Sequence, residues 1–147
     1  MIRFEPITED NMDDAIAISV RPDQEEVIAP VVYSLAQCYV LSDILTPFLI
    51  MNNNLPVGLI LFLIDPDEEE YELCRLMIDQ SQQKKGYGQE ALLLAIRYLA
   101  DAGAKKIELS HQTNNYGVGK LYESVGFHYT GVIDDGEVMM EMVIKND

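Results

Sequence analysis

A glycine-containing turn between an apolar strand and a long helix constrains the fold of this chain more than any other segment. Residues 71–78, YELCRLMI, are typical of a strand, and residues 82–103, QQKKGYGQEALLLAIRYLADAG, contain a helical repeat. One face of that helix is apolar and carries Leu92, Ala95, Ile96 and Leu99. Gly103 follows the repeat and is a natural C-terminal cap.

The turn itself, residues 83–88 with the sequence QKKGYG, combines flexible backbone with positive charge. A helix N-terminus has unpaired N–H groups and a partial positive charge, and glycine allows close approach of a ligand. These features predict an anion site suited to a pyrophosphate, to which Lys84 and Lys85 add charge. A tight turn with solvated lysines is the alternative, because neither a Walker A motif nor a complete GxGxxG is present.

The rest of the chain alternates between strand and helix patterns. Strands are predicted at residues 2–7, 47–52, 56–64 and 105–112, and in a final hairpin of residues 127–133 and 137–144. Helices are predicted after Thr8 as N-cap through Val20, from Pro22, for a turn or two within residues 31–40, and from Val118 to Gly126. This order predicts one α+β domain over residues 1–147, with a mixed, mostly antiparallel central sheet flanked by helices.

The strands at 47–52 and 56–64 are continuously apolar, so we expect both faces of the sheet to be covered there. The second of them is too short to span a membrane. The N-terminus lacks the apolar region of a signal peptide, and Cys38 and Cys74 have no metal-ligand spacing. We therefore expect a cytoplasmic protein with reduced core cysteines and no metal.

The chain is strongly acidic, with 10 Lys and Arg against 25 Asp and Glu and a formal charge of -15. A field of this sign repels nucleic acid and anionic membranes and concentrates cations. It serves solubility, or it favours a cationic substrate.

Two motifs resemble those of a known family. The first is Q-x-x-G-x-G, from Gln83 to Gly88, which follows an apolar strand. The second is N-x5-L-Y-x3-G-F, formed by Asn115, Leu121, Tyr122, Gly126 and Phe127. In this order and at this distance they resemble motifs of the GNAT superfamily, the acyl-CoA-dependent N-acyltransferases, and the resemblance extends over essentially the whole chain. Residues 20–36, 73–79 and 130–140 are most similar to bacterial spermine/spermidine acetyltransferases of the multidrug-operon type.

The sequence departs from the family pattern at three positions. Gln83 replaces the commoner arginine, and Gln80 stands where proline is common. Gly119 stands where an apolar helix residue is usual, which would loosen the short helix. None of these changes removes a group expected to act in catalysis.

The resemblance implies a GNAT-like acyl-CoA N-acyltransferase domain that uses acetyl-CoA. Backbone N–H groups from Lys84 to Gln89 would hold the pyrophosphate, and the strand end at Leu76 would pair with the pantetheine arm. The N–H near Leu76 would also polarise the thioester carbonyl. The implied cofactor-binding residues are Leu76, Met77, Ile78, Gln83, Lys84, Lys85, Gly86, Tyr87, Gly88, Gln89, Asn115 and Lys120.

The resemblance also assigns catalytic roles. Tyr122 would protonate the departing thiolate, and Glu72 or a water chain would deprotonate the amine. His111 is a weaker candidate for the base, since a lone histidine at a strand end is usually structural. Glu25 and Glu26 would bind substrate ammonium groups, unless they are only the solvated start of a helix.

We therefore expect direct acetyl transfer to a polyamine such as spermine or spermidine, by a homodimer that binds neither nucleic acid nor membrane. Another amine, such as an aminoglycoside or a protein N-terminus, remains open. So does a non-catalytic acyl-CoA-binding regulatory module, or a structural dimer-forming domain, because fold kinship does not fix function.

Overall fold

A seven-stranded sheet forms the centre of the protein, and the computed structural model describes residues 1–23 and 29–145. Along the sheet the strand order is β1-β2-β3-β4-β5-β7-β6. The strands are β1 (Ile2–Pro6), β2 (Leu45–Asn52), β3 (Leu55–Asp65), β4 (Glu70–Ile78), β5 (Lys106–Gln112), β6 (His128–Asp134) and β7 (Glu137–Val143). Among the described strands only β4 and β5 pair in parallel, which confirms the predicted mixed, mostly antiparallel α+β fold.

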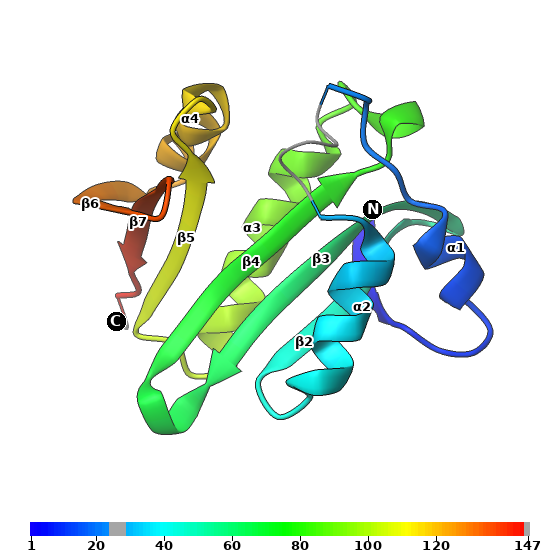
Figure 1. Ribbon diagram of the computed structural model, residues 1–147, viewed down its shortest axis with the longest axis horizontal. Helices are drawn as coiled ribbons and strands as arrows, with labels where there is room; N and C mark the ends of the chain where they lie inside the picture. Colours follow the sequence, from blue (N-terminus) through cyan, green and yellow to red (C-terminus); the bar gives the residue numbers. More distant parts are fainter. Residues whose placement is uncertain (24–28, 146–147) are drawn as a thin grey trace.

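Helices lie on both faces of this sheet (Figure 1). The α-helices are α1 (Met12–Ile16), α2 (Val31–Val40), α3 (Tyr87–Asp101) and α4 (Tyr116–Ser124), and the 3-10 turns are η1 (Pro66–Glu68) and η2 (Gln80–Gln82). In the view of Figure 1, α2 lies in front of the sheet, α3 lies behind it, and α4 lies at the end of β5. Strand β4 and helix α3, which follow each other in the chain, therefore lie in different layers of the molecule.

Strand β3 is buried on both faces, as its continuous apolar sequence predicted. Ile60 and Phe62 are fully buried in the cluster that contains α3, whereas Leu59 and Leu61 belong to the clusters on the side of α1 and α2. Fully burying one such side chain contributes about 1.5–3 kcal/mol. The centre of the sheet is consequently well packed, which supports the less buried strands on either side of it.

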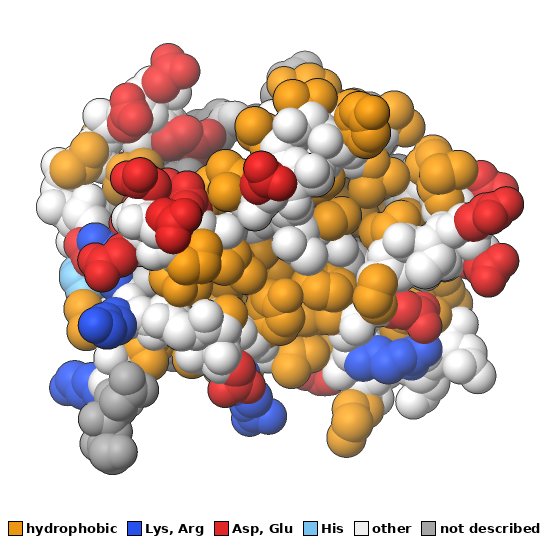
Figure 2. Space-filling model, turned by 90° about the horizontal axis from the view of Figure 1, so that it is seen from below, with side chains coloured by type: hydrophobic (Ala, Val, Ile, Leu, Met, Phe, Trp, Pro, Cys, Tyr) orange, Lys and Arg blue, Asp and Glu red, His pale blue; other side chains and the backbone are white. Residues whose placement is uncertain are grey.

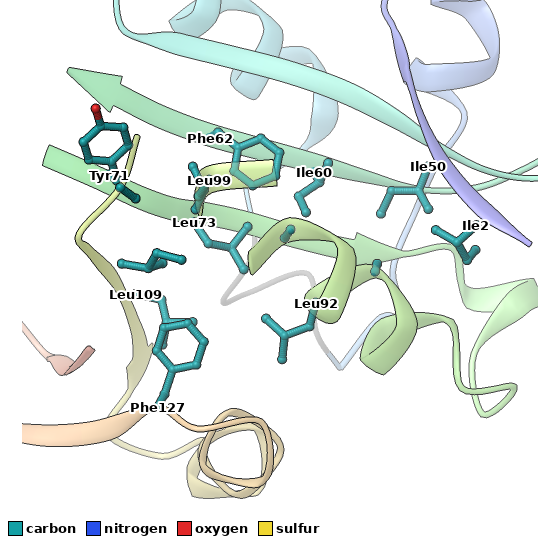
Figure 3. Close-up of a cluster of buried hydrophobic side chains, with 14 of the residues drawn as sticks. Ile2, Ile50, Ile60, Phe62, Tyr71, Leu73, Leu92, Leu99, Leu109 and Phe127 are labelled. Carbon is teal, nitrogen blue, oxygen red and sulfur yellow. The ribbon is translucent and has the colours of Figure 1, made fainter. Parts of the chain in front are cut away.

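The main core also holds the C-terminal third of the chain in place. Figure 3 shows Phe127, which follows α4, beside Leu109 of β5 and near Leu92 of α3. All three side chains are at most 3% exposed. The position of α4 therefore depends on the same core as α3.

The predicted first helix is shorter than expected. It begins after Asn11 rather than Thr8, because the Asn11 side chain accepts a hydrogen bond from the Thr8 N–H and donates to the Pro6 carbonyl. It ends at Ile16, and Ser19 instead donates its N–H to Asp79 at 2.9 Å. Hydrogen bonds to the end of β4 thus replace the helical ones that the spacing predicted.

Two further predictions concern the following segment. The helix predicted for a turn or two within residues 31–40 extends over all ten residues of α2. Pro22 and Asp23 lie in a turn, and the remainder of the helix predicted from Pro22 falls largely on residues outside the described part of the chain.

A β-bulge in β4 changes which side chains face each layer. Leu61 pairs with Arg75 and Phe62 pairs with Leu73, so that Cys74 is left without a partner across the ladder. A bulge of this kind bends its strand and increases the local twist. Beyond it, Arg75 donates hydrogen bonds to Ser34 and Gln37 of α2, which ties the bent strand to that helix.

Strands β4 and β5 separate after a single registered pair, Glu72 with Glu108. Figure 1 shows the two strands close together at one end and far apart at the other, where β4 leads into η2 and β5 leads to α4. In the described part of the chain, no registered pair joins β5 to the end of β4, which includes Leu76, Met77 and Ile78.

Charge is distributed unevenly over the surface. Figure 2 shows acidic side chains gathered toward both ends of the molecule and a broad hydrophobic area between them. Among the described residues, no helix has the length and apolar character needed to cross a bilayer.

Candidate functional site

A pocket of about 260 Å³ lies where β4 and β5 separate. Its wall comes from the end of β4, the turn before α3, and one face of α4. The lining residues are Val20, Leu76, Met77, Ile78, Gln82, Gln83, Lys84, Gly86, Tyr87, Gly88, Val118, Leu121 and Tyr122. Most residues that the sequence predicted for the cofactor therefore lie together, with Tyr122 facing the same space.

Several predicted residues lie outside the lining of this pocket. Lys85 donates to the side chain of Gln82 at 3.1 Å, and Gln89 is exposed in the first turn of α3. Asn115 and Lys120 are exposed on α4, where Asn115 occupies the N-cap position without a capping hydrogen bond from its side chain. Their predicted cofactor contacts remain predictions.

The turn before α3 has the backbone geometry of an anion site. Gly86 is the N-cap of α3 with φ of 84°, and Lys84 has φ of 64°, so both residues are left-handed. In the described part of the chain, the N–H groups of residues 84–89 donate to no backbone carbonyl. These unpaired groups stand at the positive end of a 15-residue helix, which favours a bound phosphate.

The turn is fixed to the strand that precedes it. The Gln83 side chain donates to the carbonyl of Ile78 at 3.0 Å, and Tyr87 accepts a hydrogen bond from Asn52 at its hydroxyl oxygen. Glutamine at position 83 thus has a structural role in place of the arginine that is commoner in the family pattern. The free N–H groups are consequently held in one arrangement before any ligand arrives.

The motif L-Y-x3-G-F forms the C-terminal cap of α4. The Phe127 N–H donates to the Tyr122 carbonyl at 3.1 Å, and the Gly126 N–H donates to the Glu123 carbonyl at 3.1 Å. This is a Schellman motif, which needs a left-handed residue at Gly126, where φ is 115°. The rings of Tyr122 and Phe127 are 6.2 Å apart, so the buried Phe127 anchors the residue that faces the pocket.

The phenol of Tyr122 holds its proton tightly. Burial, and next the negative charge of Glu137, raise the pKa of Tyr122 to about 12. The phenol is therefore protonated at neutral pH and can act as a proton donor.

Glu72 lies on β4 at the point where the two strands begin to separate. Burial, and next the nearby charges of Glu108, Glu70 and Glu137, together raise the pKa of Glu72 to about 7. A carboxylate with a pKa near neutrality is suited to take a proton from an amine. Glu72 is not among the residues that line the pocket, so its role as the base stays a prediction.

Glu108 and Glu137 were not predicted as site residues. They come from β5 and β7, and Glu137 acts on the pKa of both Glu72 and Tyr122. Nothing in their local sequence marks them, since their proximity depends on the order β4-β5-β7. Val118 and Leu121 were predicted as an apolar helix face, and the structure places them in the pocket wall.

His111 is structural, as the sequence suggested. Its side chain is 4% exposed, Nδ1 lies 2.7 Å from the Gln112 carbonyl oxygen, and Nε2 lies 3.0 Å from the Tyr129 hydroxyl. Both ring nitrogens are occupied. The predicted substrate residues Glu25 and Glu26 lie outside the described part of the chain. Within that part, no group of three or more His, Cys, Asp or Glu residues could hold a metal ion.

A comparison with protein families identifies the fold. Residues 9–127 match the family described as Acetyltransferase (GNAT) family. The chain belongs to the GNAT family. The GNAT fold, inferred from the two motifs, is confirmed.

One curated relative of this GNAT protein is a spermine/spermidine N(1)-acetyltransferase from Bacillus subtilis (strain 168). It is 34% identical over 92 residues, which cover 57% of this chain and 60% of that protein. The match therefore spans less than two thirds of the length of this relative.

Solved structures with the same fold include two acetyltransferases. A spermidine N-acetyltransferase from Vibrio cholerae, solved with CoA and spermine, has a TM-score of 0.78 at 16% identity, over 97% of this chain and 95% of that chain. An acetyltransferase from Thermus thermophilus has a TM-score of 0.74 at 22% identity, over 98% and 97% of the two chains. At these identities the likeness concerns the fold.

Proposed function

We propose that this GNAT protein transfers an acetyl group from acetyl-CoA to a primary amine, and that the amine is a polyamine. The observation that carries the proposal is the pocket between the end of β4, the turn before α3, and α4. At one end it has the unpaired N–H groups of the α3 turn, and Tyr122 lines its wall.

The two ends of acetyl-CoA fit different parts of the pocket. The N–H groups of residues 84–89 suit its pyrophosphate, with Lys84 and Lys85 available for further phosphate charge. Main-chain groups of Leu76, Met77 and Ile78 lack a neighbouring strand on the β5 side, so the pantetheine arm can add there as a strand does. The Leu76 N–H is then a suitable donor to the thioester carbonyl.

Glu72 and Tyr122 supply the proton transfers. Glu72 takes a proton from the ammonium group, and the free amine nitrogen forms a bond to the acetyl carbon while the carbon–sulfur bond breaks. Tyr122 donates its phenolic proton to the departing sulfur. The nitrogen then loses its extra proton to water, and the Tyr122 phenolate takes a proton back from water. No covalent bond to the enzyme is needed.

The amine is proposed to lie beside Glu72, where the surroundings are suited to a cation. Glu70, Glu108 and Glu137 all lie close enough to Glu72 to raise its pKa, so that negative charge gathers around it. Glu25 and Glu26, which the described part of the chain omits, are proposed to add further carboxylates. The Vibrio cholerae enzyme, which has the same fold, was solved with spermine bound, and the Bacillus subtilis relative acts on spermine and spermidine.

A second copy of the chain is the partner that fits α2. Exposed apolar side chains there include Val32, Tyr33, Tyr39 and Val40, each more than half exposed. Residues 31–42 carry no charge, so two chains of formal charge -15 can approach each other there with least repulsion. The homodimer accordingly remains part of the proposal.

The first prediction concerns the α3 turn. Acetyl-CoA should raise the melting temperature of the wild-type protein, because a ligand that binds only the native state stabilises it. Gly86→Asp should abolish this shift, since it places a side chain and a negative charge beside the pyrophosphate. Gly131→Asp is the matched control: Gly131 also has a positive φ, of 88°, and is exposed with no atom within 4 Å of an added β-carbon. An undiminished shift in Gly86→Asp would exclude the proposed cofactor site.

The second prediction concerns the proton donor. Tyr122→Phe should keep the affinity for acetyl-CoA and lower kcat by roughly 10²–10⁴-fold, as expected for loss of a general acid. Tyr39→Phe, which changes a tyrosine that is 85% exposed, should leave kcat unchanged. Steady-state thiol release and calorimetric binding measure the two quantities. Wild-type turnover in Tyr122→Phe would mean that another group protonates the thiolate.

The third prediction concerns the base. Because the pKa of Glu72 is raised to about 7, the rate should increase as pH rises through 7 and the carboxylate forms. Glu72→Gln should lower the rate at pH 8 and remove this rising limb of the pH–rate profile. The rate should then rise only toward the pKa of the amine itself, about 10. Glu70→Gln is the control: it removes a charge that raises the Glu72 pKa, so it should move the limb to lower pH with little change in the maximum. If the increase in rate through pH 7 were unchanged in Glu72→Gln, the base would be a water chain instead.

The fourth prediction concerns the acceptor. Catalytic efficiency should be higher for spermine and spermidine than for a simple alkylamine, because each extra ammonium group can meet a carboxylate. The advantage should shrink with salt, since exposed charges are screened over about 10 Å at 0.1 M. Equal efficiency for all three amines at every ionic strength would contradict the polyamine assignment. A preference for an aminoglycoside or a peptide N-terminus in the same assay would identify a different acceptor.

A further inference from the structure

Helix α4 packs closely against the sheet at Gly119. Gly119 is buried, and a β-carbon on it would lie 2.2 Å from the Tyr129 hydroxyl and 2.8 Å from His111 Nε2. Gly117, two residues earlier on the same helix, is exposed, and a β-carbon there would meet nothing within 4 Å. The two glycines therefore differ: packing requires the one at 119 and leaves the one at 117 free.

The groups beneath Gly119 form a fixed polar pair. Nδ1 of His111 lies 2.7 Å from the Gln112 carbonyl oxygen, so this nitrogen carries the hydrogen and donates it. Nε2 is then the acceptor, and the Tyr129 hydroxyl donates to it across 3.0 Å. His111 is 4% exposed, so displacing the Tyr129 hydroxyl would leave a buried ring nitrogen unpaired, which is unfavourable. The ring of Tyr116, at the start of α4, packs edge-on against His111 at 4.8 Å.

This contact determines how α4 lies relative to the pocket. Val118, Leu121 and Tyr122 line the pocket, and Gly119 lies on the turn between them. A helix of nine residues moves as a unit when its buried centre is lifted from the strands beneath it. A displacement at Gly119 is therefore transmitted to the Tyr122 phenol, one turn away.

We propose that Gly119, His111 and Tyr129 form a seat for α4 that positions Tyr122 for proton donation. The proposal rests on the proposed function, in which Tyr122 is the proton donor. It assigns positioning roles, since none of the three residues lines the pocket. It also explains why glycine stands where an apolar helix residue is usual in the family.

The direction of the effect separates this proposal from simple helix propensity. Alanine in place of glycine stabilises a helix where nothing obstructs the methyl group. Gly117→Ala should therefore keep or raise the melting temperature and leave kcat within twofold of wild type. Gly119→Ala should lower kcat at least tenfold, measured well below its melting temperature, with a smaller change in the KM for the amine. Equal kcat values in the two variants would overturn the proposal.

A rescue experiment tests the contact itself. Tyr129→Phe removes the oxygen that lies nearest to the added β-carbon, so in the Gly119→Ala background it should raise kcat several-fold. The same change in the wild-type background should not raise kcat, because there it only removes the hydrogen bond to His111. If Gly119→Ala alone does not fold, the double variant should recover both folding and turnover. Effects on kcat that simply add, with no rescue, would overturn the proposal.

A second cycle separates the seat from the role of Tyr122. In the Tyr122→Phe background, Gly119→Ala should lower kcat by a much smaller factor than in wild type, because the side chain that it displaces no longer donates a proton. An equal cost in both backgrounds would show that the seat does not act through Tyr122 and would overturn the inference. Wild-type turnover in Tyr122→Phe would instead refute the proton-donor role, and the positioning role with it. Rescue by Tyr129→Phe would in that case demonstrate the contact between positions 119 and 129 but no role for it in proton donation.

Discussion

The separation of β4 from β5 is the constraint on which the site depends. The two strands share one registered pair, Glu72 with Glu108, and the bulge at Cys74 bends β4 just beyond it. A strand end without a neighbour leaves N–H and C=O groups that water or a ligand must satisfy. In this protein the same separation admits Tyr122 from α4, so that the proposed proton donor and the end of β4 border one pocket.

The environments of Glu72 and Tyr122 shift both pKa values upward, and this single direction suits the two opposite roles proposed for them. For Glu72, a rise to about 7 makes the carboxylate basic enough to accept a proton near neutral pH. For Tyr122, a rise to about 12 keeps the phenol protonated at neutral pH, as a proton donor must be. Burial is the larger cause in both cases, and Glu137 contributes to both. One carboxylate on β7 therefore affects the pKa of both the proposed acid and the proposed base.

The sequence predicted those parts of the fold that local pattern controls. The apolar strands, the α3 repeat and the Gly126 cap all follow from spacing or turn chemistry. The prediction of the first helix was wrong beyond Ile16, because the hydrogen bond from Ser19 to Asp79, 60 residues away, overrides the helical spacing of the sequence. The proximity of Glu108 and Glu137 to Glu72 could not be predicted either, since it requires the strand order. Gly119 shows the same limit: by propensity alone it weakens α4, whereas the structure shows that the absent side chain lets α4 approach β5 and β6 without a clash.

The local distribution of charge differs from the net charge of the chain. A chain of formal charge -15 opposes an anionic cofactor, so attraction must be local. It is available at the α3 N-terminus with Lys84 and Lys85, whereas carboxylates gather around Glu72 on β4. Because exposed charges are screened over about 8 Å at physiological ionic strength, each region acts mainly on ions close to it. The proposed reaction uses the two regions separately, the α3 turn for the cofactor phosphates and the surroundings of Glu72 for the ammonium group.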